Sequence, residues 1–201
     1  VHVSDASNAS RTALMAIGSG DWDDGLLSLF GVPRSILPEI CDSAGQLGMT
    51  DASLFGAPIA ITGMAGDQQA ALIGQSCLEP GQTKATFGTG AFVLTQTGRT
   101  LPKSTNRLLA TVAWQLGGER HYALEGSVFV AGSLIQWLRD DLGLIDASPD
   151  TEPLARSVED NGGVYLVPAL SGLGAPHWQP HARAAIHGLT FTEKKAHVAR
   201  A

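Results

Sequence analysis

The sequence has only two cysteines, Cys41 and Cys77, among its 201 residues. They do not form a CxxC pair and are too few for the disulfide framework of a small secreted domain. Two free, buried thiols in a reducing compartment are the favoured interpretation. A single disulfide between them is the alternative.

The chain also lacks long apolar runs and clusters of positive charge. No stretch approaches the roughly 20 apolar residues that span a bilayer, and the N-terminus has no charged segment followed by an apolar core, as a signal peptide would. The 13 lysines and arginines are scattered and the formal net charge is −6, whereas phosphate neutralisation needs clustered positive charge. We therefore expect a cytoplasmic protein without membrane insertion and without a nucleic-acid partner.

Common nucleotide and metal motifs are missing as well. Neither a Walker A pattern (GxxxxGK[ST]) nor a GxGxxG pattern occurs, so spacing alone does not establish a nucleotide site. The six histidines show no metal-ligand spacing, and no metal ligand is predicted. Hydrophobic residues nevertheless make up 44% of the chain, which is enough for a sizeable packed core.

A succession of strand, glycine turn and helix is present in the first half. Ala57–Thr62 is an apolar run that predicts a buried strand, Gly63–Gly66 predicts a tight turn, and Asp67–Gln75 predicts a helix. This succession is half of a βαβ unit and indicates the α/β class. Ligands of such folds gather where strands end and helices begin.

The pattern changes after Leu78–Gly81, the best candidate linker. Hairpins are predicted around Gly88–Gly90 and around Gly117-Gly118, followed by a helix over Ser127–Leu142. A final predicted helix has barely two turns when the chain ends at Ala201, without a stop signal. We therefore expect the chain to be a fragment.

Three glycine-flanked polar segments are candidate sites: Gly66-Asp67-Gln68, Gly88-Thr89-Gly90 and Gly126–Gln136. A glycine turn brings backbone N–H groups close to a ligand, and successive N–H groups can hold an anion. From spacing alone, structural interpretations stay open. Asp67 can be an ordinary helix N-cap, Thr89 the tip of a bare hairpin, and Gly132 a helix–helix packing contact.

Five blocks of sequence resemble a known family, and this resemblance favours the functional interpretations of these three segments. In chain order they are SDASNASRTAL, TGMAGDQQAALIGQ, KATFGTGAFVLTQTG, YALEGSVFVAGSLIQWLRDDLGLI and GVYLVPALSGLGAPHWQPHARAAIHGLT. Together they resemble the FGGY carbohydrate-kinase family, and within it the members that phosphorylate glycerol. The resemblance implies a ribonuclease H-like, actin-like ATPase fold of two domains with the active site in the cleft between them. Residues 1–77 would end the first domain and 81–201 would begin the second.

The resemblance also implies roles for residues on the polyol side of the site. Asp67 resembles the catalytic base, which accepts the proton of the attacking glycerol hydroxyl. Gln68 would bind a second hydroxyl of glycerol. Phe92 resembles the aromatic residue against which the glycerol carbons pack.

On the nucleotide side, Thr89 resembles the threonine next to the phosphates, and Gly132 and Gln136 match positions that line the nucleotide pocket. ATP and Mg²⁺ are the implied cofactors. The implied reaction is ATP-dependent phosphorylation of glycerol to glycerol 3-phosphate, with ADP as the other product. A homo-oligomer is compatible with the sequence.

Three alternatives remain. Another kinase of the family would act on a pentulose or a tetritol, although the aromatic Phe92 favours glycerol. A non-catalytic actin-like binding protein would be expected to lose Asp67 or Thr89, and both are present. The third alternative is a physiological 201-residue product that has lost kinase function.

The resemblance predicts that the isolated chain is inactive, because the opposing walls of both pockets lie outside it in the family. Purified chain incubated with ATP, Mg²⁺ and glycerol should yield no glycerol 3-phosphate above a protein-free blank. Robust product formation that depends on both ATP and Mg²⁺ would overturn this prediction.

Overall fold

A computed structural model describes residues 1–201, which divide into two compact units. The first unit comprises Val1–Lys84 and Val93–Glu125. The second unit comprises Ala85–Phe92 and Gly126–Ala201. The chain therefore passes twice from the first unit to the second. Helices and strands are mixed throughout, as expected for the α/β class.

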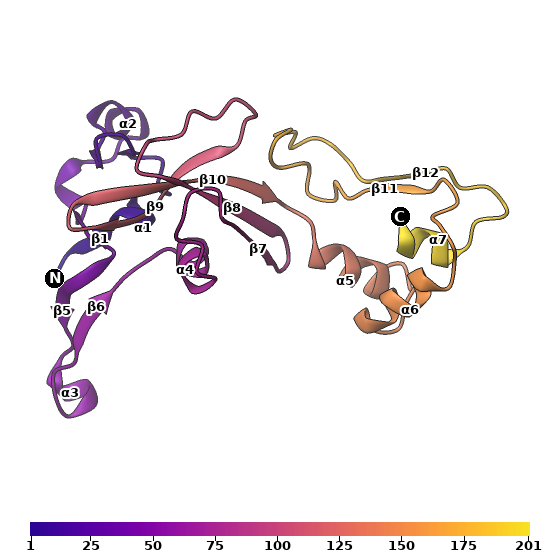
Figure 1. Ribbon diagram of the computed structural model, residues 1–201, viewed down its shortest axis with the longest axis horizontal. Coiled ribbons are helices and arrows are strands. Elements are labelled where there is room, and N and C mark those ends of the chain that lie inside the picture. The colour runs from indigo at the N-terminus through magenta and orange to yellow at the C-terminus, as the bar shows by residue number, and fades with distance from the viewer. The chain divides into compact units, whose positions relative to one another are not determined.

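The elements in the first part of the chain are mostly short (Figure 1). In order they are β1 (Val3–Asp5), α1 (Ala6–Ala9), β2 (Met15–Ala16), β3 (Asp21–Trp22), α2 (Asp24–Phe30), a 3₁₀ turn (Arg34–Ile36), β4 (Glu39–Cys41), β5 (Ala44–Met49), α3 (Ala52–Phe55), β6 (Ala60–Gly63) and α4 (Asp67–Gly74). Strand β1 pairs with β4 in parallel, and β2 pairs with β3 antiparallel.

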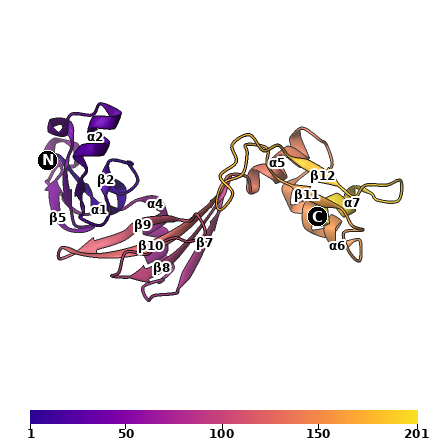
Figure 2. The ribbon, with the colours of Figure 1, turned by 90° about the horizontal axis from the view of Figure 1, so that it is seen from above.

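The second part of the chain contains the longer strands and helices. These are β7 (Thr83–Phe87), β8 (Ala91–Gly98), β9 (Leu109–Leu116), β10 (Glu119–Val128), α5 (Gly132–Asp140), a 3₁₀ turn (Ser148–Asp150), α6 (Thr151–Arg156), β11 (Tyr165–Val167), β12 (Ala185–His187) and α7 (Lys195–Arg200). Strands β7, β8, β10 and β9 form one sheet in that order (Figure 2). Strands β9 and β10 are antiparallel, with a bulge between His121 and Tyr122.

The core of the first unit forms between α1 and the inner faces of β9 and β10. Alanines on α1 allow the helix to lie close to β9, because a small side chain keeps the two backbones near each other. The buried cluster consists of Ala6, Ala9, Met15, Trp22, Leu27, Val112 and Tyr122. Segments about 100 residues apart in the sequence thus share one apolar core.

A fully buried carboxylate connects three segments of this unit. Asp5 caps α1 by accepting hydrogen bonds from the Ser7 N–H and the Asn8 N–H, both at 3.0 Å. It also accepts one from the Ser43 hydroxyl at 2.8 Å. The Gln115 N–H of β9 donates to the same hydroxyl at 3.2 Å. Strand β1, the start of β5 and strand β9 are therefore fixed to one another by polar groups that satisfy each other.

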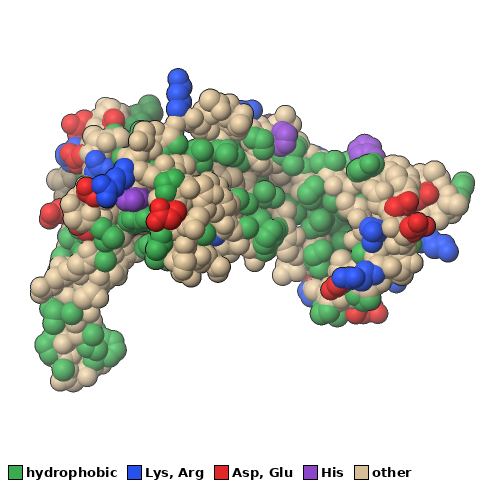
Figure 3. Space-filling view, in the orientation of Figure 1, with side chains coloured by type: hydrophobic (Ala, Val, Ile, Leu, Met, Phe, Trp, Pro, Cys, Tyr) green, Lys and Arg blue, Asp and Glu red, His purple; other side chains and the backbone are tan.

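Strands β5 and β6 form a two-stranded ribbon that ends in α3 (Figure 1). The sequence predicts a buried strand at Ala57–Thr62, and the structure has a strand at Ala60–Gly63. The prediction that this strand is buried is wrong, because all four of its residues are exposed. Strand β6 pairs with β5 alone, so no other element covers it. Apolar side chains gather at the end of the ribbon (Figure 3), where Leu54 is 70% exposed and Phe55 is 64% exposed.

Besides parts of β7, β8 and β10, the second unit contains one strand pair and three helices. Strands β11 and β12 are antiparallel, and α6 packs against α7. The helix predicted at Ser127–Leu142 is shorter than expected and begins at Gly132. It starts late because Ser127 and Val128 continue β10 instead of turning into the helix.

The turn between β7 and β8 is bound by its backbone to the start of α5. The Gly132 N–H donates to the Gly88 carbonyl at 2.8 Å, and the Ser133 N–H donates to the Thr89 carbonyl at 3.1 Å. The Thr89 carbonyl also accepts from the Ala131 N–H at 2.9 Å. N–H groups at the start of a helix have no partner within the helix, and here the turn satisfies them.

This contact leaves no room for side chains. A Cβ on Gly132 would lie 2.5 Å from the Gly88 carbonyl oxygen, and a Cβ on Gly90 would lie 2.4 Å from the Val128 carbonyl oxygen. The obstructing atoms are backbone and cannot rotate away. Both positions therefore require glycine for packing, independently of any ligand.

Neither cysteine forms a disulfide. Cys77 is buried and Cys41 is half-buried. Burial raises the pKa of the Cys41 thiol, because a thiolate loses solvation there. The prediction that both thiols are free is confirmed, whereas the prediction that both are buried holds only for Cys77. Across residues 1–201, no helix combines the length and the apolar character needed to cross a membrane.

The close contact predicts that Gly132→Ala destabilises the chain by about 1–3 kcal/mol, the usual cost of overpacking. The matched control is Gly74→Ala, also in a helix, where a Cβ would meet nothing within 4 Å. That change should be neutral or stabilise by up to about 1 kcal/mol, since alanine favours helices. Urea unfolding of both variants measures the difference, and equal midpoints would contradict the packing argument.

Candidate active site

Asp67 lies at the first position of α4, directly after the glycine turn. The N-cap residue is Gly66, which makes no side-chain capping bond, so the interpretation of Asp67 as the N-cap is wrong. The Asp67 carboxylate is exposed and accepts two hydrogen bonds from Gln68: one from its backbone N–H at 2.8 Å and one from its side-chain amide at 3.1 Å. The structure therefore leaves this carboxylate open to solvent while its neighbour orients it.

The turn before Asp67 is anchored to the core. The Gly66 N–H donates to the Ser7 hydroxyl at 2.9 Å. The buried Gln69 amide donates to the Thr111 hydroxyl of β9 at 3.3 Å. A Cβ on Gly66 would lie 2.5 Å from Gln69 Oε1, so the turn packs closely on this side chain. These contacts fix the backbone that carries Asp67.

Gln68 is held from its other side by a lysine that the sequence analysis did not single out. Lys84 is only 4% exposed, and its ammonium donates a hydrogen bond to Gln68 Oε1. Burial lowers the pKa of Lys84, and the nearby carboxylates of Glu125 and Asp67 oppose this effect. Glu125 is itself buried and pairs with Arg11 at 2.8 Å. The buried charges of Lys84 and Glu125 thus lie near the exposed Asp67 carboxylate.

The sequence carries a weak signal for this lysine. Lys84 stands between Thr83 and Ala85 in a five-residue strand whose pattern places Lys84 and Thr86 on one face. A charged residue on the inward face of a short strand needs a partner. Its partner Gln68 is 16 residues away in the sequence, which no local pattern reveals.

The predicted nucleotide residues lie in the second unit. Thr89 is exposed at the tip of the β7–β8 turn, and its carbonyl is bound to the start of α5. Gly132 and Gln136 are both exposed, one helical turn apart on α5. The structure thus brings Thr89 and Gly132 together, and Gly132 packs on the turn rather than on another helix. Phe92 lies on β8, two residues after Gly90, and is partly buried.

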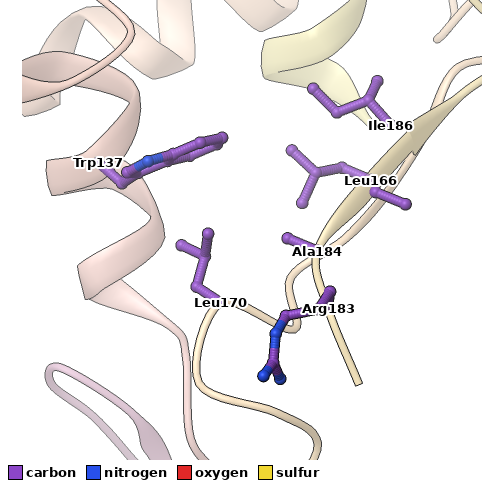
Figure 4. Close-up of a pocket in the computed structure, with 7 residues that line it drawn as sticks. Trp137, Leu166, Leu170, Arg183, Ala184 and Ile186 are labelled. Carbon is purple, nitrogen blue, oxygen red and sulfur yellow. The ribbon is translucent and has the colours of Figure 1, made fainter. Parts of the chain in front are cut away.

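A cavity of about 340 Å³ lies on another side of α5 (Figure 4). Trp137 of α5 faces Leu166 of β11 and Ile186 of β12 across it, and Arg183 is the only charged residue in its lining. This lining is largely apolar and offers little to a phosphate. The polar candidates on α5 and its turn, Thr89 and Gln136, are not part of it.

Comparison with known proteins accounts for most of the chain, and the matched domains do not coincide with the two compact units. The profile of the C-terminal domain of the FGGY family of carbohydrate kinases matches residues 83–201, and the profile of its N-terminal domain matches residues 1–74. The chain belongs to the FGGY family of carbohydrate kinases. The matches leave out residues 75–82, which contain the candidate linker. The expected domain limits, 1–77 and 81–201, stay a prediction.

Individual relatives are similar over the whole chain. A glycerol kinase of Methylobacterium nodulans is 57% identical over 201 residues, and one of Rhodospirillum centenum is 54% identical over the same length. The chain spans 40% of the length of each. The crystal structure of Plasmodium falciparum glycerol kinase with ADP matches 98% of this chain and 40% of that chain, at 39% identity and a TM-score of 0.88. The expected actin-like ATPase class is confirmed by these neighbours.

The role that the family resemblance implies for Asp67 predicts the effect of Asp67→Asn, which would remove the proton acceptor but keep the size of the side chain. We expect kcat to fall by roughly 10²-fold or more, the scale of general-base catalysis, with KM for ATP little changed. The test protein is a chimera in which this chain replaces the matching segment of the Methylobacterium nodulans glycerol kinase.

Asp51→Asn is the matched control, because Asp51 is also an exposed carboxylate at the start of a helix, α3. It should leave kcat within about twofold of the unsubstituted chimera, since the usual effect of a surface substitution is small. If Asp67→Asn behaved like Asp51→Asn, the assignment of the base would be wrong.

Proposed function

We propose that this chain is part of an ATP-dependent kinase that phosphorylates glycerol to glycerol 3-phosphate. The observation that carries the proposal is the exposed Asp67 carboxylate, oriented by Gln68 at the start of α4. It stands in a chain that belongs to a carbohydrate-kinase family and is 57% identical to a glycerol kinase.

The polyol side of the reaction needs a proton acceptor and a hydrogen-bond donor. Asp67 accepts the proton of the attacking hydroxyl as its oxygen approaches the γ-phosphorus. Phosphoryl transfer passes through a loose transition state, so a well-placed carboxylate is sufficient without being a strong base. The Gln68 amide has a second N–H that suits another hydroxyl. Phe92 offers an apolar surface for the carbon atoms.

The nucleotide side needs a backbone that the phosphates can approach, hydrogen-bond donors, and no acidic side chains nearby. The turn at Thr89 has glycines on both sides and no acidic residue from Phe87 to Phe92. Its hydroxyl is exposed, and its glycines allow a phosphate to approach the backbone. These residues fit ATP, which supplies the phosphoryl group. Gly132 and Gln136 extend the same exposed face along α5.

Mg²⁺ is the metal proposed with ATP. No three histidine, cysteine or acidic side chains in residues 1–201 lie close enough together to hold a metal ion. Mg²⁺ is ordinarily held by one or two carboxylates together with substrate phosphates and water. The residues present therefore suit an ion that arrives with the nucleotide.

The proposed location rests on the cysteines and on the distribution of charge. Two free thiols suit a reducing compartment such as the cytoplasm, and the scattered positive charge gives no surface for nucleic acid. A homo-oligomer stays an expectation from the sequence.

The chimera described above tests the proposal. Supplied with ATP and Mg²⁺, it should phosphorylate glycerol and should have a higher kcat/KM for glycerol than for a tetritol or a pentulose. The native Methylobacterium nodulans enzyme serves as the positive control, and circular dichroism checks that the chimera is folded. A folded chimera that prefers a pentulose or a tetritol would contradict the glycerol assignment, and one without any kinase activity would contradict the proposal.

A further inference from the structure

We propose that Lys84 is a positioning residue for the reaction: its ammonium sets the orientation of the Gln68 amide, and Gln68 in turn sets the orientation of the Asp67 carboxylate. This inference rests on the proposed function, because it assigns Lys84 a role in the same site. Lys84 itself does not touch the reacting atoms.

The hydrogen-bond chemistry of the three side chains permits only one arrangement. An ammonium group donates and never accepts, so the Gln68 atom that faces Lys84 must be the amide oxygen. The amide nitrogen then points the other way, where it donates to Asp67 Oδ2 at 3.1 Å. The oxygen and the nitrogen of an amide are nearly equal in shape. Without the lysine, the Gln68 amide can therefore flip.

The orientation of Gln68 matters because it holds both oxygens of the carboxylate. Its backbone N–H donates to Asp67 Oδ1 at 2.8 Å while its side chain donates to Oδ2. Hydrogen bonds to both oxygens oppose rotation of the carboxylate about its last bond. A flipped amide would place its own oxygen against Asp67 Oδ2, and the repulsion would turn the carboxylate away.

The surroundings of Lys84 show that its position is fixed. The residue is 4% exposed, which is rare for lysine unless the ammonium is paired. The buried Glu125 carboxylate, which is bound by Arg11, and Asp67 both favour the charged form. By comparison, the other lysines of the chain, such as Lys103, are exposed on the surface. Lys84 is therefore a charged group placed inside the unit, with Gln68 as its hydrogen-bond partner toward Asp67.

The test is a double-mutant cycle in the chimera, measured with glycerol and ATP. Lys84→Met removes the charge but keeps the length of the side chain, and kcat/KM for glycerol should fall about tenfold, while KM for ATP stays within about twofold. In a Gln68→Met background the same change should lower kcat/KM by less than about twofold, because the group through which Lys84 acts is gone. Lys103→Met is the matched control and should change neither parameter.

Different outcomes separate the possible failures. A tenfold loss in both backgrounds would mean that Lys84 does not act through Gln68, and no loss in the background that keeps Gln68 would mean that Lys84 does not act at all. Each of these results overturns the inference. Inactivity of the unsubstituted chimera would instead contradict the proposed function. If Lys84→Met does not fold, Lys84→Arg takes its place in the cycle, since it keeps the buried charge but moves the donor. The same non-additivity is expected there.

Discussion

The backbone contact between the β7–β8 turn and the start of α5 is the constraint on which the second unit's candidate site depends. Two carbonyls of the turn satisfy N–H groups at the start of the helix. Glycine is required at position 132, which packs against Gly88 of the turn, and at position 90, which packs against the Val128 carbonyl. The turn is held through its carbonyls, and the Thr89 carbonyl also accepts from the Ser133 hydroxyl at 2.9 Å. The Thr89 side chain takes no part in these bonds and is exposed. A polar group presented by a rigid backbone loses little entropy when a ligand binds.

In the first unit, side chains rather than backbone groups anchor the corresponding turn. The turn at Gly66 is tied to Ser7 of α1 and packs on Gln69, so the residue that follows it, Asp67, is held in place while its carboxylate is exposed. In both units a glycine turn is anchored by groups on one side and presents one polar side chain on the other. The difference is electrostatic: the first turn presents a carboxylate backed by a buried lysine, and the second presents a neutral hydroxyl.

Sequence patterns predicted those helices and turns that depend mainly on residues close together in the chain. The helix expected at Asp67–Gln75 is observed at Asp67–Gly74, and the hairpin at Gly88–Gly90 is present. The burial of β6 was not predictable, because burial depends on which other elements cover a strand, and an apolar run alone does not contain that information. Lys84 was missed for the same reason, since its burial and its partners depend on contacts between distant segments. The roles of the site residues came from the family resemblance and not from spacing.

In the proposed function, the physical demands of phosphoryl transfer would explain why the buried ammonium of Lys84 lies close to the exposed carboxylate of Asp67. In a loose transition state the attacking oxygen forms little bond to phosphorus, so the base gains little from being strong and the rate depends mainly on alignment. A solvent-exposed carboxylate rotates freely unless something holds it. Gln68 can hold it only when its own amide is oriented, and a flexible surface amide is not. An ammonium fixed in the interior supplies that orientation, because its position is set by packing and by Glu125 rather than by solvent. In the proposed mechanism, alignment at Asp67 offsets the cost of burying Lys84.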